Sequence, residues 1–235
     1  MKPTRTEAEA QARRFLWEAI QSDLRLVSSF ESLLRSVSGT LAGGEISDSH
    51  GVAHGKIAGR LADDIRVFRW ALTSGYAFQA MSLGASIQEL ALMALYIGAN
   101  DERAKRWLKW DKPERLPWKR AEVLQAVAVD KEFYKTTYML LCAAKHANPR
   151  SVLRDNASVT PLAHIFDTDP DFTPRRPPQA RFILWITLRP VFEGALWTLV
   201  DHQLLDEHQR EKLASVGNRW LTFHQEMVKK TKGNG

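Results

Sequence analysis

The chain has 235 residues, of which 44% are hydrophobic and 26% are charged. This length suits one large domain with a substantial core, and the composition excludes a disordered chain as the default interpretation. The one cysteine, Cys142, excludes an internal disulfide, and the N-terminal residues lack the basic and apolar blocks of a secretory signal. We therefore expect a cytoplasmic protein.

Two apolar stretches, residues 83–99 and 182–200, are long enough to raise the question of a membrane. The first contains Glu89, and the second contains Arg189 and Glu193. Because charged side chains are costly at the centre of a bilayer, we expect both stretches to be buried helices of a folded core and no membrane partner.

Apolar residues recur at steps of three and four along most of the chain, which is typical of helices with one buried face. No segment alternates with a period of two between hairpin turns, so no sheet is expected. The sequence predicts an all-α fold, an antiparallel helical bundle of about six helices. The predicted helices cover residues 6–37, 50–72, 76–99, 118–146, 179–205 and 207–230, with a short one over 100–110.

We expect these helices to form a single domain over residues 1–235. Its expected parts are an N-terminal helical hairpin over 1–75, a helical bundle over 76–230 and a frayed tail over 231–235. Residues 150–178 contain five prolines and are predicted to be irregular. A bend is expected near Asp130, and Pro190 should kink its helix or mark its true start. The helix over 76–99 is apolar almost all round, which predicts a central position.

The segment 103–120 holds eight Lys or Arg residues against Asp111 and Glu114, an excess equal to the net charge of +6 of the whole chain. Tryptophans alternate with these cations, and stacking surfaces beside cations suit single-stranded nucleic acid. The alternative is a solvated helix whose tryptophans pack inward. The residues predicted to bind nucleic acid are Lys105, Arg106, Trp107, Lys109, Trp110, Lys119 and Arg120.

Arg189 and Glu193 lie four residues apart in an apolar stretch, so they fall on one helical face. A buried carboxylate needs a cation, and this spacing supplies one. The pair either orients helices as a core ion pair or forms the floor of a polar site between helices. Glu89 has a comparable place in its own helix, and Lys145 and His146 end another helix, where they could hold an anion. The predicted polar site comprises Glu89, Lys145, His146, Arg189 and Glu193.

Cys142 lies one turn before His146, a spacing that a nucleophile and its base could use, but a small buried cysteine is the commoner outcome. His50 and His54 have the i, i+4 spacing of zinc ligands without a defined third ligand. We predict neither a metal nor a cofactor.

Three segments resemble the HEPN superfamily, the helical domains named for higher eukaryotic and prokaryotic nucleotide binding, and in particular one of its bacterial branches. They are the helix over 80–96 with its central Glu89, the helix end over 140–146, and the run 188–193. Many HEPN members are metal-independent ribonucleases that act as dimers in toxin or defence systems. Their motif is an Arg followed a few residues later by a His.

Arg219 and His224 have the spacing of that motif. The resemblance implies that Arg219 steadies a phosphate and that His224 assists the attacking ribose 2′-hydroxyl. On a regular helix the two side chains are about 140° apart, so their convergence needs a bend or a partner chain.

Three functions follow from these observations. The first is an HEPN-like helical module, acting as a homodimer, that binds a nucleotide, RNA or a protein partner in a defence or toxin–antitoxin context. The second is a metal-independent endoribonuclease that uses Arg219 and His224. The third is a purely structural subunit for a protein encoded by a neighbouring gene.

Overall fold

The computed structural model describes residues 5–43, 48–74, 76–111, 117–127, 130–145, 177–195, 198 and 205–232. Over these ranges the chain is all-α, with nine α-helices, one π-helical turn and no strand. The helices are α1 (Arg5–Ala19), α2 (Gln21–Gly43), α3 (Ser49–Thr73), α4 (Ala77–Ile97), α5 (Asp101–Leu108), α6 (Arg120–Val127), α7 (Lys131–Lys145), α9 (Pro177–Pro190) and α11 (Glu207–Lys232), and the π-helical turn is η2 (Val191–Ala195).

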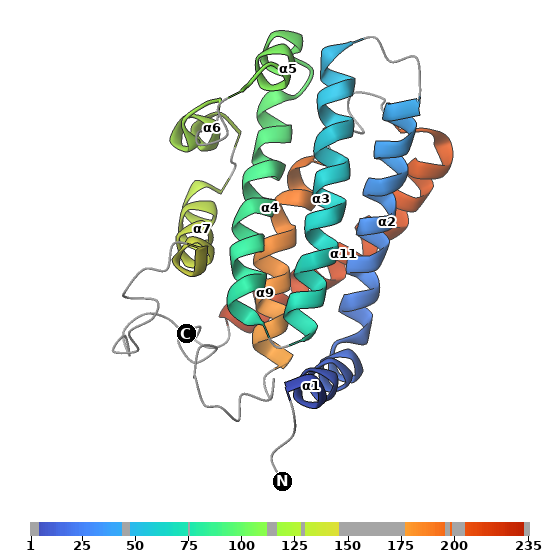
Figure 1. Cartoon of the computed structure of the whole chain (residues 1–235), viewed down its shortest axis with the longest axis vertical. Coiled ribbons are helices and arrows are strands. Elements are labelled where there is room, and N and C mark those ends of the chain that lie inside the picture. Colours follow the sequence, from blue (N-terminus) through green and yellow to red (C-terminus); the bar gives the residue numbers. More distant parts are fainter. Residues whose placement is uncertain are drawn as a thin grey trace.

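The helices form a packed bundle around α4 (Figure 1). On one side α4 contacts α3, which in turn lies against α2, and these three long helices run antiparallel to their neighbours. On its other sides α4 contacts α6, α7, α9 and η2, while α11 crosses behind α2. The predicted central position of this helix is confirmed, because an element that is apolar all round must be covered on every side.

The structure corrects the predicted number of about six helices, because two long predicted helices are each divided. The predicted helix over 6–37 is α1 and α2, which meet at a bend at Ile20. From this bend α1 turns across the end of the bundle (Figure 1), where Leu16 and Ile20 are buried. Burial of these two side chains at the bundle end, rather than a helix-breaking residue, accounts for the change in direction.

The second division confirms the bend expected near Asp130. Here α6 ends at Val127 and α7 begins at Lys131, and the Asp130 carboxylate accepts the backbone N–H of Phe133 at 3.0 Å. An aspartate in this position caps a new helix, because it pairs one of the N–H groups that the first turn leaves free. The predicted helix over 118–146 is therefore two shorter ones.

Pro190 ends α9 and is followed directly by η2. A proline has no backbone N–H and its ring crowds the preceding turn, so the regular hydrogen-bond ladder cannot continue through it. Within η2, Gly194 lies so close to α4 that a Cβ atom there would collide with Leu95. The widened turn thus brings the backbone of this segment directly against the central helix.

Helices α2 and α3 also approach each other closely. A Cβ atom on Gly55 would lie 2.8 Å from Cβ of Leu41, and one on Gly59 would lie 2.7 Å from Oγ of Ser38. Glycine at these two positions is what permits the approach. The same antiparallel register places Glu31 of α2 opposite Arg66 and Arg69 of α3.

One described helix is long and apolar enough to cross a membrane, over Gln79–Ile97 of α4. Within the fold 67% of that stretch is buried, as expected for the core helix of a bundle.

Candidate functional site

Several cations in the described part of the basic, tryptophan-rich segment contact other residues of the chain. Lys105 forms ion pairs with Asp101 at 2.7 Å and Glu102 at 3.1 Å, both on its own helix α5. Arg106 donates to the carbonyl oxygen of Pro117 at 2.8 Å and lies over the Trp118 ring, with the guanidinium carbon 5.2 Å from the ring centre. These cations therefore stabilise the local fold of the segment.

The tryptophans of this segment differ in exposure. Trp118 is buried edge-to-face on Tyr96, at 5.1 Å between ring centres, and Trp107 is half-buried against the core. Trp110 is half-buried, while Lys109 and Lys119 are exposed. The structure does not combine these side chains into a continuous stacking surface over the described part of the segment.

Arg120, the last residue of the predicted nucleic-acid set, is half-buried against α7. Its guanidinium lies 3.0 Å from the ring centre of Tyr138, and its Nη2 donates to the Tyr134 carbonyl oxygen at 3.4 Å. The Nε atom is buried and has no hydrogen-bond partner among the described residues. Burial lowers the pKa of Arg120 from its ordinary value, because the charged form loses solvation.

Two tyrosines one turn apart on α7 each donate a hydroxyl to a carboxylate on another helix. Tyr138 donates to Glu89 of α4, and Tyr134 donates to Glu193 of η2 at 3.2 Å. Burial and the neighbouring carboxylate raise the pKa of both phenols, so they remain protonated donors. The structure thus places Glu89 and Glu193 beside the same helix.

Arg189 completes this polar region. Its Nε donates to Glu193 at 2.8 and 3.0 Å, its Nη2 donates to Asp130 at 3.4 Å, and its guanidinium lies 3.9 Å from the Phe133 ring centre. The ion pair expected from the i, i+4 spacing is therefore present. Of the other residues predicted for this polar site, Lys145 is the last residue of α7, and His146 lies outside the described residues.

Arg219 and His224 contact different elements. Arg219 donates from Nη1 to the Ser29 hydroxyl of α2 at 3.2 Å, whereas Nδ1 of His224 accepts the indole N–H of Trp185 of α9 at 3.0 Å. Because α11 is continuous through both residues, it supplies no bend that would bring them together.

His224 has a defined protonation state in this arrangement. An indole N–H only donates, so Nδ1 must be unprotonated and the neutral imidazole carries its proton on Nε2. Burial, and next the positive charge of Arg189, lower the pKa of His224 below its ordinary value of 6.5. The hydrogen bond from Trp185 and the lowered pKa both favour the neutral imidazole.

The two histidines with zinc-ligand spacing do not form a metal centre with the described residues. Nε2 of His54 lies 3.0 Å from the carbonyl oxygen of Gly98, at the end of α4. Within the described ranges no group of three or more His, Cys, Asp or Glu residues could hold a metal ion.

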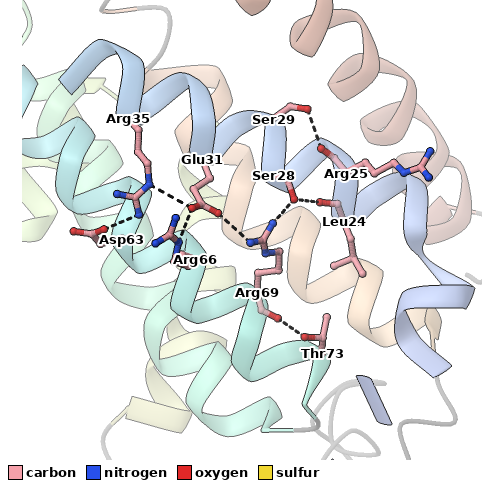
Figure 2. Close-up of polar contacts among 10 residues, drawn as sticks. All are labelled: Leu24, Arg25, Ser28, Ser29, Glu31, Arg35, Asp63, Arg66, Arg69 and Thr73. Carbon is pink, nitrogen blue, oxygen red and sulfur yellow. Dashed lines mark hydrogen bonds and ion pairs between the residues drawn. The ribbon is translucent and has the colours of Figure 1, made fainter. Parts of the chain in front are cut away.

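The sequence interpretation missed a cluster of arginines on the outer surface of α2 and α3 (Figure 2). Figure 2 shows arginines from both helices converging on Glu31, with distances of 2.7 Å from Arg66, 3.2 Å from Arg69 and 3.4 Å from Arg35. Arg35 also pairs with Asp63 at 2.8 Å. One carboxylate therefore anchors three guanidinium groups.

Two buried carboxylates, Glu31 and Asp64, hold arginines of this surface, whereas the side chain of Asp63 is 65% exposed. The side chains of Glu31 and Asp64 are each 7% exposed, whereas those of Arg66 and Arg60, which pair with them, are 60% and 67% exposed. Because the buried acids hold these arginines from the protein side, the guanidinium groups of Arg60 and Arg66 face the solvent.

Large apolar side chains are exposed beside these arginines. Val67 and Trp70 of α3 are 48% and 50% exposed. Arg13 of α1 donates to the Ser74 hydroxyl at 2.9 Å, with its guanidinium 6.0 Å from the Trp70 ring centre. We call this surface the aromatic–arginine face, and it consists of Arg13, Arg60, Arg66, Val67 and Trp70.

The position of the face could have been read from the sequence. The apolar stripe of the helix predicted over 50–72 includes Leu61, Ile65 and Phe68, so residues on the opposite side of the helix, such as Arg66, Val67 and Trp70, are expected to be exposed. No known protein family, curated protein or solved structure matches the chain. Function is therefore inferred from these contacts alone.

Proposed function

We propose that this chain is a non-catalytic helical module that binds a protein partner through the aromatic–arginine face. The observation that carries the proposal is that exposed arginines held by buried carboxylates lie beside a half-exposed tryptophan and valine. Tryptophan and arginine are the residue types that contribute most to protein interfaces. An apolar patch rimmed by polar groups is also typical of an interaction site.

The contacts of the predicted catalytic pair favour a binding role. Arg219 is directed to Ser29 and His224 to Trp185, so a phosphate could not contact both without rearrangement. The contacts of the basic segment favour a protein partner over nucleic acid, because Arg106 and Arg120 lie over aromatic rings of the chain and donate to its carbonyl oxygens. Arg60 and Arg66, by contrast, each use only Nε within the described part of the chain.

The test is purification of the tagged chain from its native cells, with Trp70→Ala beside the wild type. Leu221→Ala is the matched control, because Leu221 is a comparably exposed apolar residue on α11, at 55%. We expect a protein that is retained by the wild type and by Leu221→Ala, and that is lost with Trp70→Ala. Equal retention by all three chains would contradict the proposal.

A metal-independent ribonuclease is the second candidate, and one observation favours it. Trp185, which donates to the half-buried His224, lies one turn before Arg189 on α9, so an imidazole and a cation are near the same part of that helix. The test is cleavage of single-stranded RNA in the presence of a metal chelator. Cleavage that is lost in His224→Ala and kept in His208→Ala, an exposed histidine of the same helix, would support this candidate.

The HEPN-like relationship stays a prediction and forms part of this proposal. Five further features also stay predictions: the homodimer, the RNA or nucleotide ligand, the partner from a neighbouring gene, the cytoplasmic location and the defence or toxin–antitoxin context. The proposed protein-binding role agrees with the non-catalytic form of that family and with a structural partner protein.

A further inference from the structure

We infer that the partner presents an acidic amphipathic helix to the aromatic–arginine face. This inference rests on the proposed function and adds the chemistry of the partner. The binding helix would place carboxylates against Arg60 and Arg66, and aliphatic or aromatic side chains against Val67 and Trp70.

Charge complementarity supports carboxylates as the polar groups of the partner. The exposed Asp63 lies between Arg60 and Arg66 on α3, but its charge is paired with Arg35 at 2.8 Å. Arg66 uses Nε for Glu31, and Arg60 uses Nε for Asp64. The other N–H groups of these two guanidinium groups have no hydrogen-bond partner among the described residues. Because the buried acids already fix both side chains, an incoming carboxylate loses little conformational entropy in binding them, and planar guanidinium groups match carboxylates.

The shape of the face supports a helix as the occupant. Arg60, Arg66, Val67 and Trp70 lie within a third of the circumference of α3, and from Arg60 to Trp70 they span about 15 Å. A straight ridge of this length is matched by two to three turns of another helix whose apolar residues recur at steps of three and four.

The contacts of Trp70 argue against nucleic acid as the occupant. Its ring stacks on Tyr76, at 5.8 Å between centres, and the Arg13 guanidinium lies 6.0 Å from its centre. A nucleobase needs an open ring face, and the stacked Tyr76 competes for one, whereas apolar side chains can pack on any exposed part of the indole. A second copy of the chain is also disfavoured, because the same arginines would then face each other.

The experiment is selection of displayed peptides of about 16 residues, a length that forms helices on binding, on the immobilised full chain. We expect enriched peptides that carry Glu or Asp together with Leu, Phe or Trp at helical spacing. Binding of an enriched peptide should weaken about thirtyfold in Trp70→Ala and about tenfold in Arg66→Gln, and it should weaken as salt rises. Leu221→Ala and Lys229→Gln, exposed positions of α11, should bind as the wild type does.

Several results would overturn the inference. These are the absence of enrichment, enrichment of basic or uncharged peptides, and acidic peptides whose affinity is unchanged in Trp70→Ala and Arg66→Gln. Binding of polyuridylate that is lost in Trp70→Ala would also overturn it. If the native cells yield a Trp70-dependent protein while the peptides fail, only the acidic helix is wrong, and if both experiments fail, the proposed function is wrong as well.

Discussion

Arg66 donates its Nε–H to the Glu31 carboxylate at 2.7 Å, although the arginine side chain is 60% exposed and the glutamate side chain is 7% exposed. The pair therefore links an exposed side chain of α3 to a buried side chain at the α2–α3 interface. An exposed arginine is ordinarily mobile, because it loses side-chain entropy when fixed, but a buried partner holds it in one place. This relationship is the basis of the aromatic–arginine face.

Glu31→Gln should lower the free energy of unfolding by about 2 kcal/mol, because three arginines lose the charge that anchors them. Urea denaturation measures the change. Glu18→Gln is the matched control, since Glu18 is exposed and pairs only with exposed Arg14 among the described residues, and it should cost less than about 0.5 kcal/mol. Equal losses in the two variants would contradict the anchoring role.

Arg181 bridges two helices that flank α9. It donates to Asp23 of α2 at 2.6 Å and to Glu226 of α11 at 2.7 Å. Burial raises the pKa of Asp23, and its bond to Arg181 opposes that effect. Arg181→Met should therefore cost about 3 kcal/mol in unfolding free energy, because a buried carboxylate loses its cation. Arg14→Met, which breaks an exposed ion pair, is the control. An equally small loss of unfolding free energy in Arg181→Met would contradict the bridging role of Arg181.

The pH dependence of stability should depend on His224. Its folded pKa is lowered, first by burial and then by Arg189, while the unfolded imidazole keeps a value near 6.5. Below that pH the unfolded chain binds a proton that the folded chain does not, so the unfolding free energy falls as the pH decreases. His224→Gln, whose amide oxygen can accept the Trp185 N–H, should flatten this part of the curve in thermal melts. If the variant's melting temperature depends on pH as the wild type's does, folding does not lower the pKa of His224.

The two tyrosines of α7 should contribute independently. Tyr134→Phe removes a donor to Glu193, and Tyr138→Phe removes a donor to Glu89, so each should cost about 1 kcal/mol in urea denaturation. Because the hydroxyls bind different carboxylates, the double variant should cost the sum of the two. A double variant no less stable than either single one would indicate that the two carboxylates act as one unit.

The helices, their buried faces and the bend near Asp130 could be predicted, because periodicity and capping are local properties of the sequence. The bend at Ile20 could not. Helical hydrogen bonds continue through it, from Ile20 to Leu16 at 2.9 Å and from Leu24 to Ile20 at 3.0 Å. No residue there interrupts a helix, and the change of direction comes from contacts with the end of the bundle.

Which cations find partners inside the chain could not be predicted from the sequence. Charge counting treats Arg120 like Lys119, yet Arg120 lies over the ring of Tyr138 and Lys119 is exposed. The Arg189–Glu193 pair could be predicted because both residues share one helix. Arg66 and Glu31 are far apart in sequence, so their pairing depends on the register of α2 against α3 and needs the structure.

The most direct test of the partner-binding face is amide hydrogen exchange of the full chain, measured with and without the protein that purifies with it. The account predicts slower exchange over residues 60–73 of α3 and over the adjoining part of α1, because the partner covers the aromatic–arginine face. Slower exchange over residues 103–120 or around His224, with α3 unchanged, would contradict it.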